Sequence, residues 1–142
     1  MDKCPFKQFQ TWFEAVKDCE KGIEVNMMAV STLGLNGYPN SRYVLLKGLH
    51  EGNFVFFTNY DSEKGHEIDK CPKVSLLFIW PSKHWSVRIQ GDVDKTSVEE
   101  SDKYFKSRPL ASQAAAACSQ QSHVIDEDRS KYVHFNKYRP TK

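Results

Sequence analysis

The sequence of 142 residues lacks several features that would point to a particular class of protein. It has no apolar run near the roughly 20 residues that a membrane-spanning helix needs, so we expect no association with a membrane. Neither sign of charge dominates, because 20 Lys and Arg stand against 18 Asp and Glu for a net charge of +2, which argues against nucleic-acid binding. Residues 1–10 lack the apolar stretch of a signal peptide, and we therefore expect a cytoplasmic protein.

Motifs for metals, dinucleotides and hydrolytic catalysis are also missing. The four cysteines include no Cys-x-x-Cys pair, and the five histidines include no His-x-x-x-His pair. Because a zinc site usually needs ligands close in sequence, we expect no metal site and four free thiols. No Gly-x-Gly-x-x-Gly sequence follows a strand-like segment, which argues against a dinucleotide-binding fold. No Ser-His-Asp order or carboxylate pair stands out, so the sequence assigns no catalytic residue.

What the chain does contain is typical of one folded domain spanning residues 1–142. Hydrophobic residues make up 39% and charged residues 27%, which is close to ordinary globular usage. Aromatic residues reach 13%, and this richness indicates either a dense core or a surface on which flat ligands stack.

Hydrophobic periodicity predicts a helix over residues 1–22 and then a run of strands over residues 26–95. Phe6, Phe9, Phe13 and Val16 recur at helical spacing, and Gly22 is the expected stop. The Gly34–Gly37 turn contains an Asn-Gly pair, which favours a tight hairpin. We expect the strands at Met27–Thr32, Ser41–Lys47, Asn53–Thr58, Lys73–Trp80 and His84–Lys95.

Three further helices are predicted, one among the strands and two after them. Ser62 is expected to cap the first, over Ser62–Cys71. Thr96-Ser97 before Glu99-Glu100 indicates a capping box on the second, which is expected to reach Phe105. The third is expected over Ala111–Gln121, within a helical segment 97–122 that precedes a polar tail, 123–142. Consecutive strands with turn-length links predict an α+β, mainly β fold, in which an antiparallel sheet or small barrel has helices packed outside.

Several cations stand where two interpretations remain open. Arg42 and Lys47 bracket a strongly apolar strand, either as its solvated ends or as a pair that frames an anion. The strand-to-helix segment from Thr58 to Lys64 is either a capped surface helix or a phosphate-binding turn. Arg108 at the Ser107-Arg108-Pro109 corner is either a surface residue or part of a small anion site with Ser112.

These segments together resemble the pyridoxine (pyridoxamine) 5′-phosphate oxidase family, whose enzymes use flavin mononucleotide (FMN). The similarity covers nearly the whole chain in family order and spacing. The matching stretches are Lys7-Gln8-Phe9, Trp12-Phe13-Glu14, Arg42–Gly48, Phe56–Tyr60, Ser62–Gly65, Ser75–Trp80, Val87–Gly91, Tyr104–Pro109, Ser112-Gln113 and Ser119–Ser122.

The resemblance implies a fold, a cofactor and an activity. The family fold is a split β-barrel with flanking helices, which works as a homodimer with FMN at the interface. Family members oxidise pyridoxamine or pyridoxine 5′-phosphate at C4′ to pyridoxal 5′-phosphate, and O2 reoxidises the flavin. The flavin supplies the redox chemistry, whereas the protein supplies binding and orientation.

The resemblance also assigns roles to individual residues. In the family pattern, Arg42 and Lys64 hold the FMN phosphate, and a second set of polar residues holds the phosphate of the substrate. The implied cofactor-binding residues are Arg42, Tyr43, Val44, Leu45, Phe57, Thr58, Lys64, Gln121 and Ser122. The implied substrate-binding residues are Lys47, Tyr104, Arg108 and Ser112.

The chain departs from the family pattern at three places. Glu63 stands where the family has Arg beside the FMN phosphate, and Trp85-Ser86 replaces an Arg-Gln pair, so we expect weaker FMN binding. The chain also ends at Lys142, before the family's C-terminal Arg-Leu-His-Asp region, so we expect closing strands of the barrel to be missing. Three alternatives follow: an FMN-dependent oxidase; a weak or inactive truncated homologue that binds FMN or pyridoxal phosphate or pairs with a full-length partner; and a folded relic that binds neither.

Overall fold

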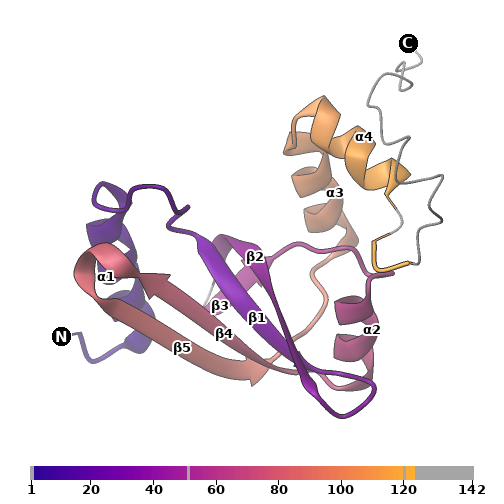
Figure 1. Ribbon diagram of the computed structural model, residues 1–142. Coiled ribbons are helices and arrows are strands. Elements are labelled where there is room, and N and C mark those ends of the chain that lie inside the picture. The colour runs from indigo at the N-terminus through magenta and orange to yellow at the C-terminus, as the bar shows by residue number, and fades with distance from the viewer. Residues whose placement is uncertain (1, 51, 120, 124–142) are drawn as a thin grey trace.

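A computed structural model describes residues 2–50, 52–119 and 121–123. Its centre is one antiparallel sheet of five strands in the order β3-β2-β1-β4-β5. The strands are β1 (Met27–Leu33), β2 (Pro39–His50), β3 (Asn53–Phe56), β4 (Lys73–Trp80) and β5 (Trp85–Asp92). The curled, half-barrel sheet with helices outside confirms the predicted mainly β, α+β architecture (Figure 1).

Within the part of the chain that the structure describes, four α-helices accompany the sheet. They are α1 (Pro5–Lys17), α2 (Glu63–Lys70), α3 (Val98–Ser107) and α4 (Leu110–Cys118). Helix α1 packs against the sheet at the end far from α2, and α3 and α4 stand side by side above α2 in the view of Figure 1. The chain thus brings α2, α3 and α4 to the same end of the molecule.

An aromatic core joins α1 to the sheet. Phe9 is 3% exposed, and its ring centroid lies 4.9 Å from that of Phe54 and 5.0 Å from that of Phe78. Trp80 is 1% exposed and donates from Nε1 to the carbonyl of Val25 at 3.0 Å, so its one polar group is satisfied. Much of the aromatic content is therefore packing rather than a ligand surface.

Predicted caps and turns are confirmed where the signal is local. Ser62 and Ser97 accept hydrogen bonds from the N–H groups of Gly65 and Glu100, at 3.4 and 3.1 Å. Gly37 has a φ of +86° in the β1–β2 hairpin, a conformation that glycine adopts at little cost.

Several predicted boundaries are wrong. Helix α1 ends at Lys17 and not at Gly22, because the N–H groups of Cys19 and Glu20 both bond the Val16 carbonyl and close the last turn. Strand β2 is longer than predicted, and β5 and α4 end earlier than predicted, at Asp92 and Cys118. Residues 124–142 of the predicted tail lie outside the described residues.

The most consequential error concerns the third strand, which ends at Phe56 and not at Thr58. Leu46 pairs with Phe56 and Gly48 with Val55, so Lys47 is an extra residue in β2 and forms a β-bulge. The pairing resumes past the bulge at Leu46 and Phe56 and then stops, which leaves Phe57 and Thr58 beyond the paired region. Both residues then enter the loop to α2 instead of completing a strand.

Candidate functional site

Two connected hollows lie where β2, the β3–α2 loop and the last two helices meet. The first, called here the small cavity, has a volume of about 390 Å³ and is lined by Asn40, Ser41, Arg42, Tyr43, Glu63, Lys64, Gln121 and Ser122. The second, called the large cleft, has a volume of about 1410 Å³. Tyr43, Lys64 and Gln121 line both, so the two hollows adjoin.

The small cavity gathers five of the residues assigned to the cofactor: Arg42, Tyr43, Lys64, Gln121 and Ser122. Lys64 is 6% exposed, and its Nζ donates to Ser62 Oγ at 3.0 Å and to Gln121 Oε1 at 3.2 Å. Lys64 therefore belongs to a buried polar cluster rather than to the outer face of a surface helix. The phosphate-binding interpretation of this turn gains support from that burial.

Electrostatics in the small cavity favour an anion. Burial, followed by the nearby charge of Arg42, lowers the pKa of Lys64, and the Glu67 carboxylate offsets part of this effect. Two cations facing one space disfavour each other's charged form. An anion bound between them would stabilise both charged forms, and a phosphate group would supply the negative charge.

Arg42 occupies a more complex environment than its sequence position suggests. Its Nη2 donates to Glu67 Oε2 at 2.9 Å, and its Nη1 donates to Thr32 Oγ1 and, at 3.2 Å, to the Asn40 carbonyl. The Glu67 side chain is fully buried, whereas that of Arg42 is 22% exposed. Arg42 is thus anchored on one side and open to the small cavity on the other.

Glu67 accepts hydrogen bonds on both carboxylate oxygens. Thr32 Oγ1 donates to Oε2 and Asn40 Nδ2 donates to Oε1, each at 2.5 Å. Burial opposes the charge of Glu67, but the hydrogen bonds from Thr32, Asn40 and Arg42, with the Arg42 charge, outweigh it and hold the pKa of Glu67 below its ordinary value. The carboxylate is therefore ionised in the folded protein at neutral pH.

Sequence reasoning missed Glu67, Thr32 and Asn40. Two signals were available: Glu67 follows Lys64 by three residues, which places both on one helix face, and Thr32 continues the inward alternation of Met28 and Val30 in β1. Neither signal identifies Arg42 as the partner, because the contact spans 25 residues of sequence.

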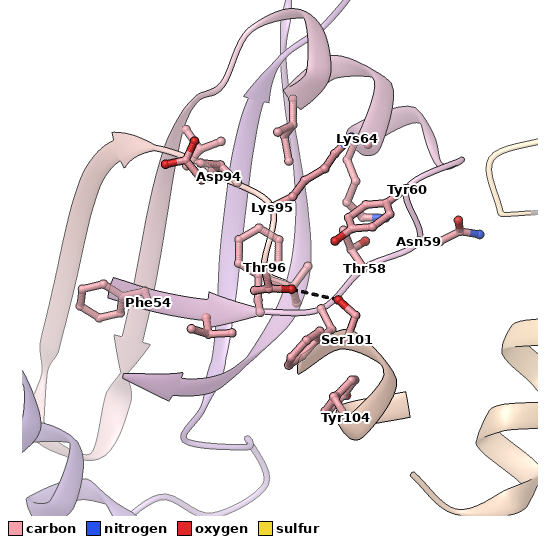
Figure 2. A pocket seen from close by; sticks show the side chains of 18 of the residues that line it. Phe54, Thr58, Asn59, Tyr60, Lys64, Asp94, Lys95, Thr96, Ser101 and Tyr104 are labelled. Carbon is pink, nitrogen blue, oxygen red and sulfur yellow. Dashed lines mark hydrogen bonds between the residues drawn. The ribbon is translucent and has the colours of Figure 1, made fainter. Parts of the chain in front are cut away.

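The large cleft collects most of the other predicted residues. Val44 from β2, Phe57 and Thr58 from the β3–α2 loop, and Tyr104 and Arg108 from α3 and its C-terminus line it. Figure 2 shows Thr58, Lys64 and Tyr104 approaching this space from three different elements. The volume exceeds the roughly 300–1,000 Å³ of common small-molecule pockets, so the cleft has room for a large flat ligand together with a second molecule.

An aromatic stack forms one wall of the cleft. The rings of Phe57 and Tyr104 lie 3.9 Å apart at their centroids and within 6° of parallel. The Lys47 ammonium lies 5.8 Å from the Tyr104 ring centroid, which is a cation–π distance. Residues assigned separately to cofactor and substrate are therefore in direct contact.

Three predicted residues do not line either hollow. Leu45 is half-buried in β2, Lys47 reaches the site through Tyr104, and Ser112 lies in the first turn of α4, where its N–H bonds the Pro109 carbonyl at 2.9 Å. Trp85 and Ser86 also lie outside both hollows. Trp85 packs near Trp12, with 5.9 Å between ring centroids, which gives this departure from the family pattern a packing role.

The ionisation of Glu67 predicts a specific acid sensitivity. A carboxyl group whose pKa is lowered by folding contributes stability above its unfolded value, and loses it as the pH falls through the folded value. Here the ordinary value is 4.5, so the wild-type protein is expected to lose stability as the pH falls below that value. Urea unfolding between about pH 5 and about pH 3 should show a smaller decline in Glu67→Gln. An equal decline in both proteins would show that other carboxylates cause the loss of stability at low pH.

Comparisons with known proteins found similar sequences and similar folds. A family model described as pyridoxamine 5′-phosphate oxidase matches residues 14–141. A pyridoxine/pyridoxamine 5′-phosphate oxidase of Burkholderia cenocepacia is 50% identical over 122 residues, covering 86% of this chain and 56% of that protein. One from Paraburkholderia phytofirmans is 49% identical over 131 residues, covering 92% of this chain and 61% of that protein. The chain thus spans between about half and two thirds of the length of these relatives.

Solved structures show the same fold at lower identity. PhzG from Burkholderia lata, in complex with tetrahydrophenazine-1-carboxylic acid, has a TM-score of 0.82 at 23% identity and covers 92% of this chain and 64% of its own. A pyridoxamine 5′-phosphate oxidase-related, FMN-binding protein from Nostoc punctiforme has a TM-score of 0.70 at 16% identity and covers 99% of this chain and 75% of its own. At these identities the likeness concerns the split-barrel fold alone.

Among the described residues, no helix is long and apolar enough to cross a bilayer.

Proposed function

The chain belongs to the pyridoxamine 5′-phosphate oxidase family, and from this premise we propose that it binds FMN and oxidises pyridoxamine or pyridoxine 5′-phosphate to pyridoxal 5′-phosphate with O2 as acceptor. The observation that carries the proposal is the convergence of Arg42 and Lys64 on the small cavity, next to a cleft lined by Val44, Phe57 and Thr58. A phosphate and a flat ring joined in one ligand match this pair of hollows.

The residues present fit such a cofactor. Arg42 and Lys64 would hold its phosphate, with Gln121 and Ser122 beside them, and the β2 segment at Val44 would run along the ring system. FMN held there would supply two-electron redox chemistry, in which the substrate loses two electrons and two protons at C4′ and O2 gains them to form hydrogen peroxide. The protein's part in this chemistry is to orient the two ligands and exclude water between them.

A second group of residues supports a substrate phosphate site. Arg108 lines the cleft on the side of α3, and Lys47 extends over the ring of Tyr104. Arg108 and Lys47 would neutralise a phosphate separately from Arg42 and Lys64. Two anion sites therefore explain two groups of cations in one small domain.

We extend the proposal to a homodimer formed through the exposed sheet face. Tyr43 is 71% exposed, Ile79 is 52% exposed and Leu77 is 36% exposed, and Ala29 pairs with both Tyr43 and Leu77 in the register. Neighbouring strands thus present one apolar patch, which a second copy would cover. Sedimentation equilibrium measures this directly, and a monomer at micromolar concentration would contradict it.

The function is tested with FMN and pyridoxamine 5′-phosphate. We expect the purified protein to keep flavin absorbance after FMN is added and the solution desalted, and to form pyridoxal 5′-phosphate and peroxide in a steady-state assay. Flavin retention without turnover would favour a binding protein, the alternative that the chain's partial coverage of its relatives raises. A folded protein that retains no flavin would contradict the proposal.

A further inference from the structure

We propose that Glu67 is a positioning residue that sets which edge of the Arg42 guanidinium faces the small cavity. Glu67 lines neither the small cavity nor the large cleft, so it acts only through Arg42. The inference rests on the proposed function, because the anion concerned is the phosphate of FMN.

The hydrogen bonds of Arg42 leave the N–H donors on one edge of its planar guanidinium group without a partner among the described residues. A guanidinium carries five N–H donors, and here both N–H groups of Nη1 and one of Nη2 are directed to Thr32, Asn40 and Glu67. Within residues 2–50, 52–119 and 121–123, no hydrogen-bond acceptor is paired with Nε or with the second N–H of Nη2. These two donors lie on the same edge and are suited to bidentate binding of a phosphate.

Glu67 is built to hold the opposite edge in place. Its carboxylate is fully buried in α2 and receives hydrogen bonds from Thr32 on β1 and from Asn40 and Arg42 on β2. Three secondary-structure elements therefore fix the carboxylate, and the carboxylate fixes the guanidinium. An arginine held in this way loses less conformational entropy when it binds an anion.

The position and the charge of Glu67 have opposite effects on the binding of a phosphate at Arg42. Glu67 is negative, so by charge alone its removal would strengthen the binding of a phosphate at Arg42. By positioning, its removal would weaken that binding. The sign of the change therefore separates the two effects.

Glu63 provides a matched control for the charge. It is an exposed carboxylate that lines the small cavity, and among the described residues it makes no hydrogen bond or ion pair with Arg42. Glu63→Gln and Glu67→Gln each remove one negative charge near the same space. Only the second substitution also removes the anchor of Arg42.

The test compares FMN with riboflavin, which has the same ring system and no phosphate. Both are titrated into the wild-type protein and the two variants, and binding is followed by flavin fluorescence. We expect the FMN-to-riboflavin affinity ratio to fall about tenfold in Glu67→Gln, the effect of one charge-assisted hydrogen bond, and to rise in Glu63→Gln. An unchanged or increased ratio in Glu67→Gln would overturn the inference.

Two further measurements distinguish a loss of stability from a loss of phosphate binding. A merely structural Glu67 would lower the melting temperature and weaken both flavins alike, which leaves the ratio unchanged. If Glu67→Gln does not fold, Glu67→Asp carries the test, because it preserves the charge and shortens the side chain by one methylene group, which withdraws the carboxylate from its 2.9 Å contact with Arg42 Nη2. A normal ratio in Glu67→Asp would then overturn the inference.

Failure of the proposed function gives a different result from failure of this inference. A wild-type protein that binds neither flavin, or binds both equally, would contradict the assignment of the small cavity to the FMN phosphate and the positioning role with it. A wild-type preference for FMN that survives Glu67→Gln would overturn the positioning role alone.

Discussion

Arg42→Ala is expected to reduce the free energy of unfolding by about 3–5 kcal/mol, because it leaves a buried carboxylate without its cation. The Arg42–Glu67 pair is 2.9 Å long, and the Glu67 side chain has no exposed surface. Thr32 and Asn40 would still donate to the carboxylate, but neither carries a charge. Urea unfolding at neutral pH measures the loss.

A surface ion pair of similar length serves as the control. Lys73 and Asp92 lie 3.0 Å apart, but their side chains are 78% and 64% exposed, so Lys73→Ala is expected to change stability little. The deficit of Arg42→Ala should also shrink at acid pH, because protonation of Glu67 removes the unpaired charge. A stability loss in Arg42→Ala no larger than that in Lys73→Ala would show that the buried pair is not what the geometry indicates.

Gly65→Ala is expected to destabilise the protein by about 3 kcal/mol, at the upper end for overpacking, and to abolish FMN retention. A Cβ at position 65 would lie 2.0 Å from the carbonyl oxygen of Tyr60 and 2.7 Å from its carbonyl carbon. Because these are backbone atoms, the loop from Thr58 to Ser62 would have to move. That loop positions Lys64, so stability and ligand binding fail together.

Gly91→Ala is the matched control for this substitution. A Cβ at position 91 would meet no atom within 4 Å, and β5 pairs regularly with β4 at this residue. The variant should therefore unfold at nearly the wild-type urea concentration. A Gly65→Ala protein with the unfolding midpoint of Gly91→Ala would contradict the close approach of α2 to the Tyr60 carbonyl.

Local signals in the sequence predicted the order of elements and many of their ends. The serine caps at Ser62 and Ser97 and the glycine turn at Gly37 depend on contacts within three or four residues. The bulge at Lys47 could not be predicted in this way, because it arises from the pairing of two strands. Nor could the end of β3 at Phe56, because it depends on where the pairing with β2 stops.

The candidate site shows the same difference between local signals and long-range contacts. By itself, the sequence determined that Arg42, Lys64, Tyr104 and Arg108 occur in a family order, because motif spacing is a property of the chain. Only the tertiary structure decided that Arg42 is anchored by Glu67 and that Phe57 stacks on Tyr104. Such contacts join residues far apart in the chain, and their geometry is set by strand register and helix packing rather than by neighbouring residues.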